Sequence, residues 1–175
     1  MTEKEFLNKI ANGKDDFLQS FLDILRSNKI KFCAIGGLAV NAYADPVVSL
    51  DLDVVIVAQK LETLIPKLKK YFKVRNFANS INLSEKGSDL RIQIQMDDRY
   101  QSFIKRAKPR ETLGYKIPVA AIEDVFQGKV WAASDETRRP SKRQKDLADI
   151  LRLIEVKNNL VKLLPSMLRK QLQIK

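Results

Sequence analysis

The stretch that decides the fold runs from Gly36 to Val57 and reads GGLAVNAYADPVVSLDLDVVIV. Its two glycines follow the apolar run KFCAI, and its last part is a second apolar run that carries two aspartates. Apolar and polar residues alternate through residues 49–54, which is the period of a strand with one buried face. We therefore predict a strand, a glycine turn, a short helix and a second strand, over residues 31–35, 36–37, 38–44 and 49–57.

The two aspartates, Asp51 and Asp53, lie on one face of the second predicted strand. Residues two apart on a strand have Cα atoms about 6–7 Å apart, so the two charges repel each other unless a cation or water screens them. Divalent ions held by both carboxylates can organise a triphosphate for in-line attack. Aspartate is otherwise a poor strand former. We therefore favour metal ligation by Asp51 and Asp53 over a merely exposed strand face.

The double glycine offers a place for phosphate groups. Glycine permits positive φ and lets a ligand approach the backbone closely. A helix that begins beyond Gly37 would direct free N–H groups toward an anion. Taken alone, a double glycine is more often only a tight turn, so its meaning depends on the aspartates that follow.

A third carboxylate often completes such a metal site, and Asp89 is the best candidate. Residues 89–95 are predicted to form a strand in which Asp89 and Gln93 lie on the polar face. Asp89 would bind metal or accept a proton from an attacking hydroxyl. A turn aspartate after Gly87 and Ser88 is nearly as good an interpretation. Gln93 is a neighbour on the same face that cannot act as a base.

The whole pattern predicts an α+β (α/β) fold, in which a small mixed sheet is flanked by helices and followed by a helical C-terminal half. Residues 1–103 would form the α/β core, and residues 104–175 a basic, mainly helical part packed on it. Pro66 must shorten or kink the helix that contains it. The other predicted elements are helices over 15–27, 61–72, 98–107, 121–134, 141–156 and 158–172, strands over 80–84 and 89–95, and an extended stretch over 112–119.

The residue types that the chain lacks exclude several kinds of chemistry. None of the 175 residues is a histidine, which removes Ser-His-Asp and Cys-His catalysis and histidine-ligated zinc. Any metal must be a hard ion held by carboxylates, which favours Mg²⁺ or Mn²⁺. Cys33 is the only cysteine, so no intrachain disulfide can form. Because it lies in an apolar run, we interpret Cys33 as a buried structural thiol.

Positive charge is concentrated in the C-terminal part. The net charge is +11, with 15 basic and 13 acidic residues in 1–103 but 17 basic and 8 acidic residues in 104–175. Such a surface suits a polyanion such as RNA, DNA or nucleotide phosphates, although charge alone fits a merely solvated surface equally well. No apolar run is long enough to span a bilayer, and the N-terminus lacks a signal-peptide pattern. We therefore expect a cytoplasmic protein without a membrane partner.

A second group of candidate residues lies downstream, at Lys129 and in the segment 138–153, RRPSKRQKDLADILRL. Apolar residues recur in this segment at helical spacing, and Lys145, Asp146 and Asp149 lie at the margin of the apolar face. Lysine binds phosphate as a point charge, and arginine does so with two hydrogen bonds. Without the upstream motif, a solvated basic helix start would be the preferred interpretation.

The motifs resemble the nucleotidyltransferase superfamily of the DNA polymerase β type. The signature of this superfamily is a Gly-Gly or Gly-Ser turn, a short helix and an Asp-x-Asp strand. Gly36-Gly37 and Asp51-Leu52-Asp53 match it, and Ser49 occupies the usual small-hydroxyl position two residues earlier. The chain departs from many relatives at Val47, where they have an arginine.

More narrowly, the chain is similar to the abortive-infection nucleotidyltransferase toxins of bacterial toxin–antitoxin pairs. That group has a lysine on a downstream helix and a later Lys/Arg-Asp pair, to which Lys129 and Lys145-Asp146 correspond. The similarity covers roughly residues 22–155. It implies that Lys129 contacts phosphate and that Asp146 orients or assists the site. The candidate nucleotide-binding residues are Gly36, Gly37, Ser49, Lys129 and Lys145, and the candidate catalytic residues are Asp51, Asp53, Asp89, Lys129 and Asp146.

The implied reaction is a metal-dependent transfer of a nucleoside monophosphate from an NTP to a hydroxyl, with release of pyrophosphate. The acceptor would be an RNA such as a tRNA end, or a protein, and an antitoxin protein would be a further partner. The main alternative is a catalytically weak or inactive relative that binds RNA or a protein partner. A transferase that modifies small antibiotics is a third hypothesis, which the basic C-terminal half disfavours.

Overall fold

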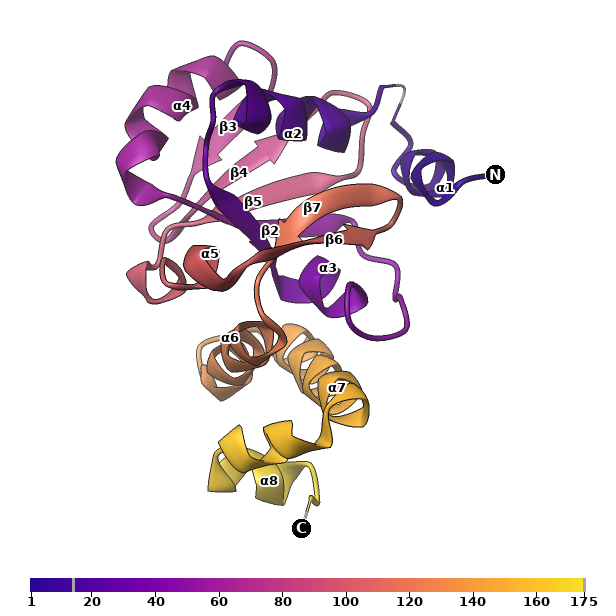
Figure 1. The fold of residues 1–175 in the computed structure, drawn as a ribbon, viewed down its shortest axis with the longest axis vertical. Coiled ribbons are helices and arrows are strands. Elements are labelled where there is room, and N and C mark those ends of the chain that lie inside the picture. Colours follow the sequence, from indigo (N-terminus) through magenta and orange to yellow (C-terminus); the bar gives the residue numbers. More distant parts are fainter. Residues whose placement is uncertain (14, 175) are drawn as a thin grey trace.

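Seven strands form one mixed sheet in the structure, a computed structural model that describes residues 1–13 and 15–174 (Figure 1). The strands lie in the order β3-β4-β5-β2-β1-β7-β6. Their bounds are β1 Phe32–Ile35, β2 Asp51–Ile56, β3 Lys73–Asn76, β4 Ser80–Ser84, β5 Arg91–Gln95, β6 Lys108–Thr112 and β7 Tyr115–Val119. The fold is therefore α+β, and the strand that carries the two aspartates lies in the middle of the sheet.

The register of the sheet sorts its side chains onto two faces. β2 runs antiparallel to β1 and parallel to β5, and β1 runs parallel to β7. Residues that pair across neighbouring strands point to the same face. From β3 to β2, one face carries the apolar row Val74-Leu83-Ile92-Leu52, and the other carries the polar row Arg75-Asn82-Gln93-Asp53.

Two helices, α2 (Phe17–Ser27) and α4 (Leu61–Leu68), lie over the apolar face (Figure 1). The ring of Phe17, at the start of α2, packs against the ring of Phe72, which follows α4, with centroids 4.9 Å apart. The short helix α1 (Glu3–Ile10) precedes them and begins with a capping box made by Thr2 and Glu5. Because these helices bury the apolar face, only the polar face of the sheet is available for a functional site.

The remaining helices lie on the side of the polar face. α3 (Gly36–Asn41) connects β1 to the segment before β2, and α5 (Phe103–Arg106) precedes β6. Below them, α6 (Ile122–Ser134) and α7 (Pro140–Val156) pack against each other and against α3, and α8 (Ser166–Gln171) ends the described chain (Figure 1). This arrangement brings the basic C-terminal helices next to the strand that carries the aspartates.

Most predicted elements are confirmed, with the strands and helices around the two aspartates among them. The helix predicted at 61–72 is shortened to α4, which contains Pro66. The helix predicted at 158–172 is wrong as one element: a 3₁₀ segment, Asn158–Leu163, is separated from α8 by Pro165, which cannot continue a helix. The helix at 98–107 is also shorter than predicted, because the chain becomes extended at Ala107 and enters β6. α1, β3 and most of β6 were not predicted from the sequence.

The sheet continues past residue 103, where the sequence predicts a division between two parts. β6 and β7, at 108–119, form a hairpin that joins the sheet beside β1. The extended stretch predicted at 112–119 is therefore part of a pair of strands. The division of the chain at residue 103 stays a prediction. None of the helices described here is both long enough and apolar enough to cross a bilayer.

Candidate active site

The carboxylates of Asp51 and Asp53 lie on the polar face of the sheet, as predicted from the alternation in β2. Asp53 pairs with Ile35 across β1, so it lies beside the first residue of α3. That residue, Gly36, has φ +66°, and a Cβ atom on it would lie 2.2 Å from Asp53 Oδ2. Only glycine leaves room for the Asp53 carboxylate at this position.

The second glycine lies in a corner with a hydroxyl and an ammonium group. A Cβ atom on Gly37 would lie 3.8 Å from Ser49 Oγ and 4.0 Å from Lys145 Nζ. Lys145 Nζ itself is 3.4 Å from Ser49 Oγ. The structure therefore brings together three of the predicted nucleotide-binding residues, which come from α3, the segment before β2 and α7. An open glycine, a hydroxyl donor and a lysine suit a phosphate group.

Lys129 projects from α6 into a buried network of ion pairs. Its side chain is 8% exposed, and its Nζ lies 3.0 Å from Asp146 Oδ1 and 2.7 Å from Asp149 Oδ2. Arg138 Nε donates to the second oxygen of Asp146 over 2.6 Å. Burial opposes the charge of Lys129, but Asp149 and Asp146 outweigh this effect and raise its pKa. Lys129 is therefore held as a cation that is fixed in position.

Arg138 and Asp149 also belong to this network, although the sequence placed them only within the candidate segment 138–153 and predicted no site role for either. The available signal was the spacing of Asp146 and Asp149, three residues apart on one turn of a helix. Both aspartates are buried, with 2% and 3% exposure. Two buried carboxylates on one helix require a cation opposite them, and Lys129 meets that requirement.

The site residues from the sheet and from the helices share one cavity. It is lined by Gly36 and Asp53 from the sheet side and by Lys129, Arg138 and Asp146 from the helices. Burial raises the pKa of Asp53, Lys129 lowers it in part, and the neighbouring charge of Asp51 raises it further. A cation placed here would offset both the burial and the repulsion between the two aspartates.

Asp51 faces a second, larger hollow of about 220 Å³ that also touches Asp53 and Gln93. Two basic side chains reach Asp51: Lys142 Nζ at 3.3 Å and Arg91 Nε at 3.7 Å. Neither was predicted as a site residue, although Lys142 lies one helical turn before Lys145. The hollow is therefore rimmed by positive charge, with the two carboxylates at its floor.

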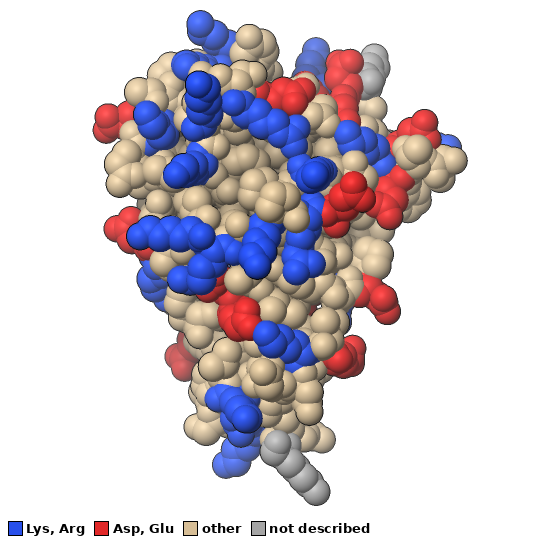
Figure 2. All heavy atoms as spheres, in the orientation of Figure 1, with Lys and Arg blue, Asp and Glu red and all other residues tan. Residues whose placement is uncertain are grey.

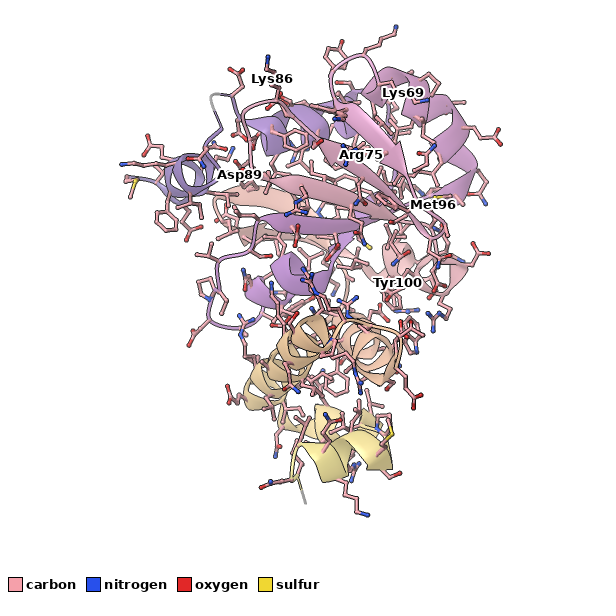
Figure 3. The ribbon with its side chains drawn as sticks, turned by 180° about the vertical axis from the view of Figure 1, so that it is seen from behind. Lys69, Arg75, Lys86, Asp89, Met96 and Tyr100 are labelled. Carbon is pink, nitrogen blue, oxygen red and sulfur yellow. The ribbon has the colours of Figure 1, made fainter. Side chains whose placement is uncertain are left out.

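Asp89 requires a correction, because the structure does not bring it into either cavity. β5 begins at Arg91, two residues later than predicted, and Asp89 lies in the preceding turn. Its backbone N–H donates to the carbonyl of Ala11, and its carboxylate accepts from Asn12 Nδ2 over 2.6 Å. Figure 3 shows Asp89 beside α1 and far along β5 from Met96. Gln93 pairs with Asp53 instead, so an amide occupies the neighbouring position on the sheet.

The remaining donors fit a magnesium ion that is shared with a substrate. Among residues 1–13 and 15–174, no cluster of three acidic, histidine or cysteine side chains forms a metal site. Mg²⁺ commonly takes only one or two carboxylates and completes its shell with water and substrate phosphates. Asp51 and Asp53 supply two such oxygens, and the amide of Gln93 lies beside them. The donor set therefore suits Mg²⁺ or Mn²⁺ bound together with a nucleotide.

Solved structures with the same fold include three nucleotidyltransferases. The lincomycin-bound lincosamide antibiotic adenylyltransferase LnuA is 15% identical, with a TM-score of 0.56 over 81% of this chain and 99% of the other. The enzyme ANT(2″)-Ia in complex with adenylyl-2″-tobramycin is 14% identical, with a TM-score of 0.60 over 89% and 96% of the two chains. A putative nucleotidyltransferase from Thermotoga maritima is 16% identical, with a TM-score of 0.53 over 86% and 95%. At these identities the likeness shows the fold alone.

The sequence itself matches a family. No curated protein is significantly similar in sequence to this chain. Residues 47–173, which are most of the chain, match the family described as "Nucleotidyl transferase AbiEii toxin, Type IV TA system". This match includes Asp53, Lys129 and Asp146, which line one cavity, and Asp51, which faces the neighbouring hollow. The chain therefore belongs to the AbiEii family of nucleotidyltransferase toxins.

Proposed function

We propose that this chain transfers a nucleoside monophosphate from an NTP to the 3′-hydroxyl of an RNA, in a reaction that requires Mg²⁺ or Mn²⁺. One observation carries the proposal. Asp53 from the sheet and Lys129 and Asp146 from two helices line a single cavity, next to the corner formed by Gly37, Ser49 and Lys145. Two metal-binding carboxylates beside a phosphate-binding corner are the parts that this reaction needs.

The residues divide into a phosphate-binding group and a group at the reacting centre. Ser49 and Lys145 would bind the outer phosphates of the NTP, with the open backbone of Gly37 between them. Lys129, kept charged by Asp146 and Asp149, would stabilise negative charge at the α-phosphate. The oxygen of the acceptor attacks the α-phosphorus, the bond to the bridging oxygen breaks, and pyrophosphate leaves while the acceptor proton passes to solvent.

Asp51 and Asp53 would hold the divalent ion. Such an ion polarises phosphoryl oxygens and neutralises the charge that develops on the leaving group. Lys142 and Arg91, which reach Asp51 here, could then turn to substrate phosphates. We assign no metal-binding or proton-accepting role to Asp89, because its carboxylate bonds to Asn12.

We also propose a toxin role, which rests on the family, and a cytoplasmic location. The type IV toxin–antitoxin description implies an antitoxin partner for this chain. Transfer to an essential RNA, for example a tRNA end, would explain toxicity, since a tRNA that carries an extra nucleotide no longer presents the hydroxyl to which its amino acid is attached. A net charge of +11 supports a polyanionic acceptor.

Incubation with each α-labelled NTP, Mg²⁺ and total RNA tests the proposal. We expect labelled RNA, no label when EDTA is present, and a loss of at least about 100-fold in Asp51→Ala, because metal ligands supply several kcal/mol of transition-state stabilisation. Asp89→Ala is the matched control and should keep its activity. Salt-dependent RNA binding without label transfer under any condition would favour the non-catalytic alternative.

The structural neighbours make antibiotic modification a second candidate. The structure of LnuA is lincomycin-bound, and that of ANT(2″)-Ia is a complex with adenylyl-2″-tobramycin. Assays of the same protein with lincomycin and tobramycin as acceptors separate the two functions. Label on either drug but not on RNA would overturn our choice of acceptor.

A further inference from the structure

The polar face of the sheet extends beyond the two aspartates as an uncovered surface. Alternate residues of β4 and β5, such as Ile81, Leu83, Ile92 and Ile94, are at most 2% exposed and lie under the helices. Their neighbours on the other face remain partly or fully exposed. We call this surface the strand platform, and it consists of Lys73, Arg75, Asn82, Ser84, Arg91 and Gln93.

Cross-strand pairing arranges the strand platform in two rows that start at the aspartates. The rows are Asp51-Arg91-Ser84-Lys73 and Asp53-Gln93-Asn82-Arg75. Neighbouring strands lie about 4.8 Å apart, so each row extends for about 14 Å from β2 to the edge strand β3. The strand platform therefore joins the catalytic carboxylates to an open edge of the molecule.

The charge of the strand platform is positive away from the carboxylates. Lys73 and Arg75 are exposed at its outer edge, and the Arg91 side chain is 69% exposed near its inner end. Asp51 and Asp53 are the only acidic members of the two rows, all of whose residues the structure describes. Basic side chains spaced along a path toward the metal-binding carboxylates suit a chain of phosphates.

An unpartnered oxygen within the strand platform indicates a ligand with a hydrogen-bond donor. Asn82 Oδ1 is buried and accepts no hydrogen bond from any residue that the structure describes. Asn82 also lines the 220 Å³ hollow with Asp51, Asp53 and Gln93. Buried acceptors are normally bonded, so a turn of the Asn82 side chain toward the hollow, where its oxygen would accept an O–H or N–H from a ligand, is favoured. A ribose 2′-hydroxyl beside the acceptor site would supply one.

We propose that the strand platform binds the 3′-terminal nucleotides of a single-stranded RNA acceptor. Lys73, Arg75 and Arg91 contact its phosphates, and Asn82 contacts a ribose hydroxyl. The RNA enters over β3 and presents its terminal hydroxyl at Asp53. The identity of the acceptor rests on the proposed nucleotidyl transfer. The strand platform, however, lies in the N-terminal part of the chain. An interpretation based on net charge would place the RNA on the basic C-terminal helices instead.

Binding without metal or NTP tests the surface separately from the reaction. We would titrate a labelled single-stranded RNA with the full chain in EDTA at several salt concentrations. Each phosphate contact on a single strand contributes about 0.7 to the slope of log affinity against log salt. Lys73→Ala/Arg75→Ala should therefore weaken binding and lower the slope by about 1.4. These residues lie on the edge strand, and far-UV circular dichroism with a thermal melt checks that the variant folds.

The matched control removes the same charge from the other side of the sheet. Lys69 and Lys70 are exposed and follow α4, which covers the apolar face; Figure 3 shows Lys69 beside α4 and Arg75 on the strands. Lys69→Ala/Lys70→Ala should leave the slope unchanged. An equal decrease of the salt slope in both double variants would overturn RNA binding by the strand platform, because the decrease would then follow from the lower net charge alone.

Further results decide between the surface, its occupant and the reaction. Competition by poly-glutamate as strong as that by RNA would overturn the RNA in favour of an acidic protein. Asn82→Ala should remove the preference for RNA over DNA of the same sequence, and an unchanged preference would overturn the contact to ribose. If the wild type transfers label but Lys73→Ala/Arg75→Ala has an unchanged salt slope, the proposed function stands and RNA binding by the strand platform is overturned. If this variant has a reduced salt slope but the wild type transfers no label, RNA binding by the strand platform stands and the proposed function is overturned.

Discussion

At Gly36, the backbone of the chain comes into contact with the carboxylate of Asp53. The positive φ of this residue and the missing Cβ are both required, because a methyl group would overlap Asp53 Oδ2. Gly37 differs, since a Cβ there would meet its neighbours only at ordinary contact distance. The two glycines of the motif therefore differ in what they do: the first leaves space for the Asp53 carboxylate, and the second keeps the corner beside Ser49 and Lys145 open.

Substitution of the two glycines by alanine should separate these roles. We expect Gly36→Ala to abolish label transfer, because the new methyl group displaces Asp53, and to cost about 1–2 kcal/mol of stability for the left-handed backbone. Gly37→Ala should fold normally and keep measurable transfer with a raised KM for NTP. Steady-state assays and urea denaturation of both variants give the comparison. Equal activity of the two variants would show that Gly36 does not set the position of Asp53.

The site also depends on the buried positive charge of Lys129. Lys129→Met leaves Asp149 and Asp146 buried with less compensation, so we expect a loss of about 3–5 kcal/mol of unfolding free energy. Asp149→Asn added to this variant should recover part of the loss, because it removes one of two buried charges that share Lys129, which leaves Arg152 beside position 149 and Arg138 beside Asp146. Urea unfolding of the wild type, both single variants and the double variant measures this coupling. If the losses of unfolding free energy in the two single variants add up in the double variant, Lys129 and Asp149 do not interact.

At the scale of elements, the sequence predicts what depends on local periodicity and misses what depends on partners. β2 could be predicted because its alternation and its two aspartates lie in one short run. The position of Asp89 could not be predicted, because β5 starts only where Leu50 O accepts from Arg91 N, and Asp89 bonds to Asn12 across the fold. These contacts join residues far apart in the chain, which single-sequence periodicity does not register.

α7 shows why the site was only partly predicted. The face of α7 that is turned toward the site consists of Lys142, Lys145, Asp146, Asp149 and Arg152. These residues recur at the three- and four-residue spacing that usually marks an apolar core face. The apolar residue Leu151 of this helix is 36% exposed, whereas Asp146 and Asp149, expected only at the margin of the apolar face, are buried. Charged residues can replace apolar ones on a buried helix face only when another element supplies the opposite charge, here α6.

α7 also supports the segment before β2. Arg152 Nη2 donates to Asn41 Oδ1 over 3.0 Å and also bonds to the carbonyl of Asp45. The amide of Asn41 in turn bonds to the N–H and the carbonyl of Val47, at 3.0 and 2.7 Å. The segment that ends at Ser49 is therefore held by a contact from the C-terminal part of the chain.

Arg152→Ala should loosen that segment, and it should also lower the stability of the protein, because Arg152 Nη1 donates to the buried carboxylate of Asp149 over 2.7 Å. Hydrogen bonds to charged groups contribute about 1.5–3 kcal/mol, so we expect amide exchange over residues 43–49 to speed up by at least roughly tenfold. Glu155→Ala, an exposed change on the same helix, is the control and should leave this exchange unchanged. Hydrogen–deuterium exchange of both variants measures the effect. Unchanged exchange in Arg152→Ala would show that the segment is held by its own contacts.

At the scale of the whole molecule, the active site is the place where the sheet and the basic helices meet. Figure 2 shows lysines and arginines over much of one face of the molecule, above the sheet as well as over the helices below it. The carboxylates of Asp51 and Asp53 lie among such positive charges, since Lys142 and Arg91 both reach Asp51. This local excess of cations should weaken the binding of a bare divalent ion, and it should favour a metal ion that arrives with the negative charge of a triphosphate.

Thermal unfolding tests this joint binding. Mg²⁺ alone at millimolar concentration should shift the melting temperature little, because Lys142 and Arg91 compete with it for Asp51. Mg²⁺ with NTP at 100 times its Kd should add about 2.7 kcal/mol and raise the melting temperature by roughly 5–11 °C for a chain of this size. EDTA should remove most of this shift, and Asp51→Ala/Asp53→Ala should not show it. A large shift with Mg²⁺ alone would mean that the two aspartates and Gln93 bind the ion without a substrate. The same shift from NTP in EDTA would mean that the triphosphate is held by Lys145 and its neighbours without metal.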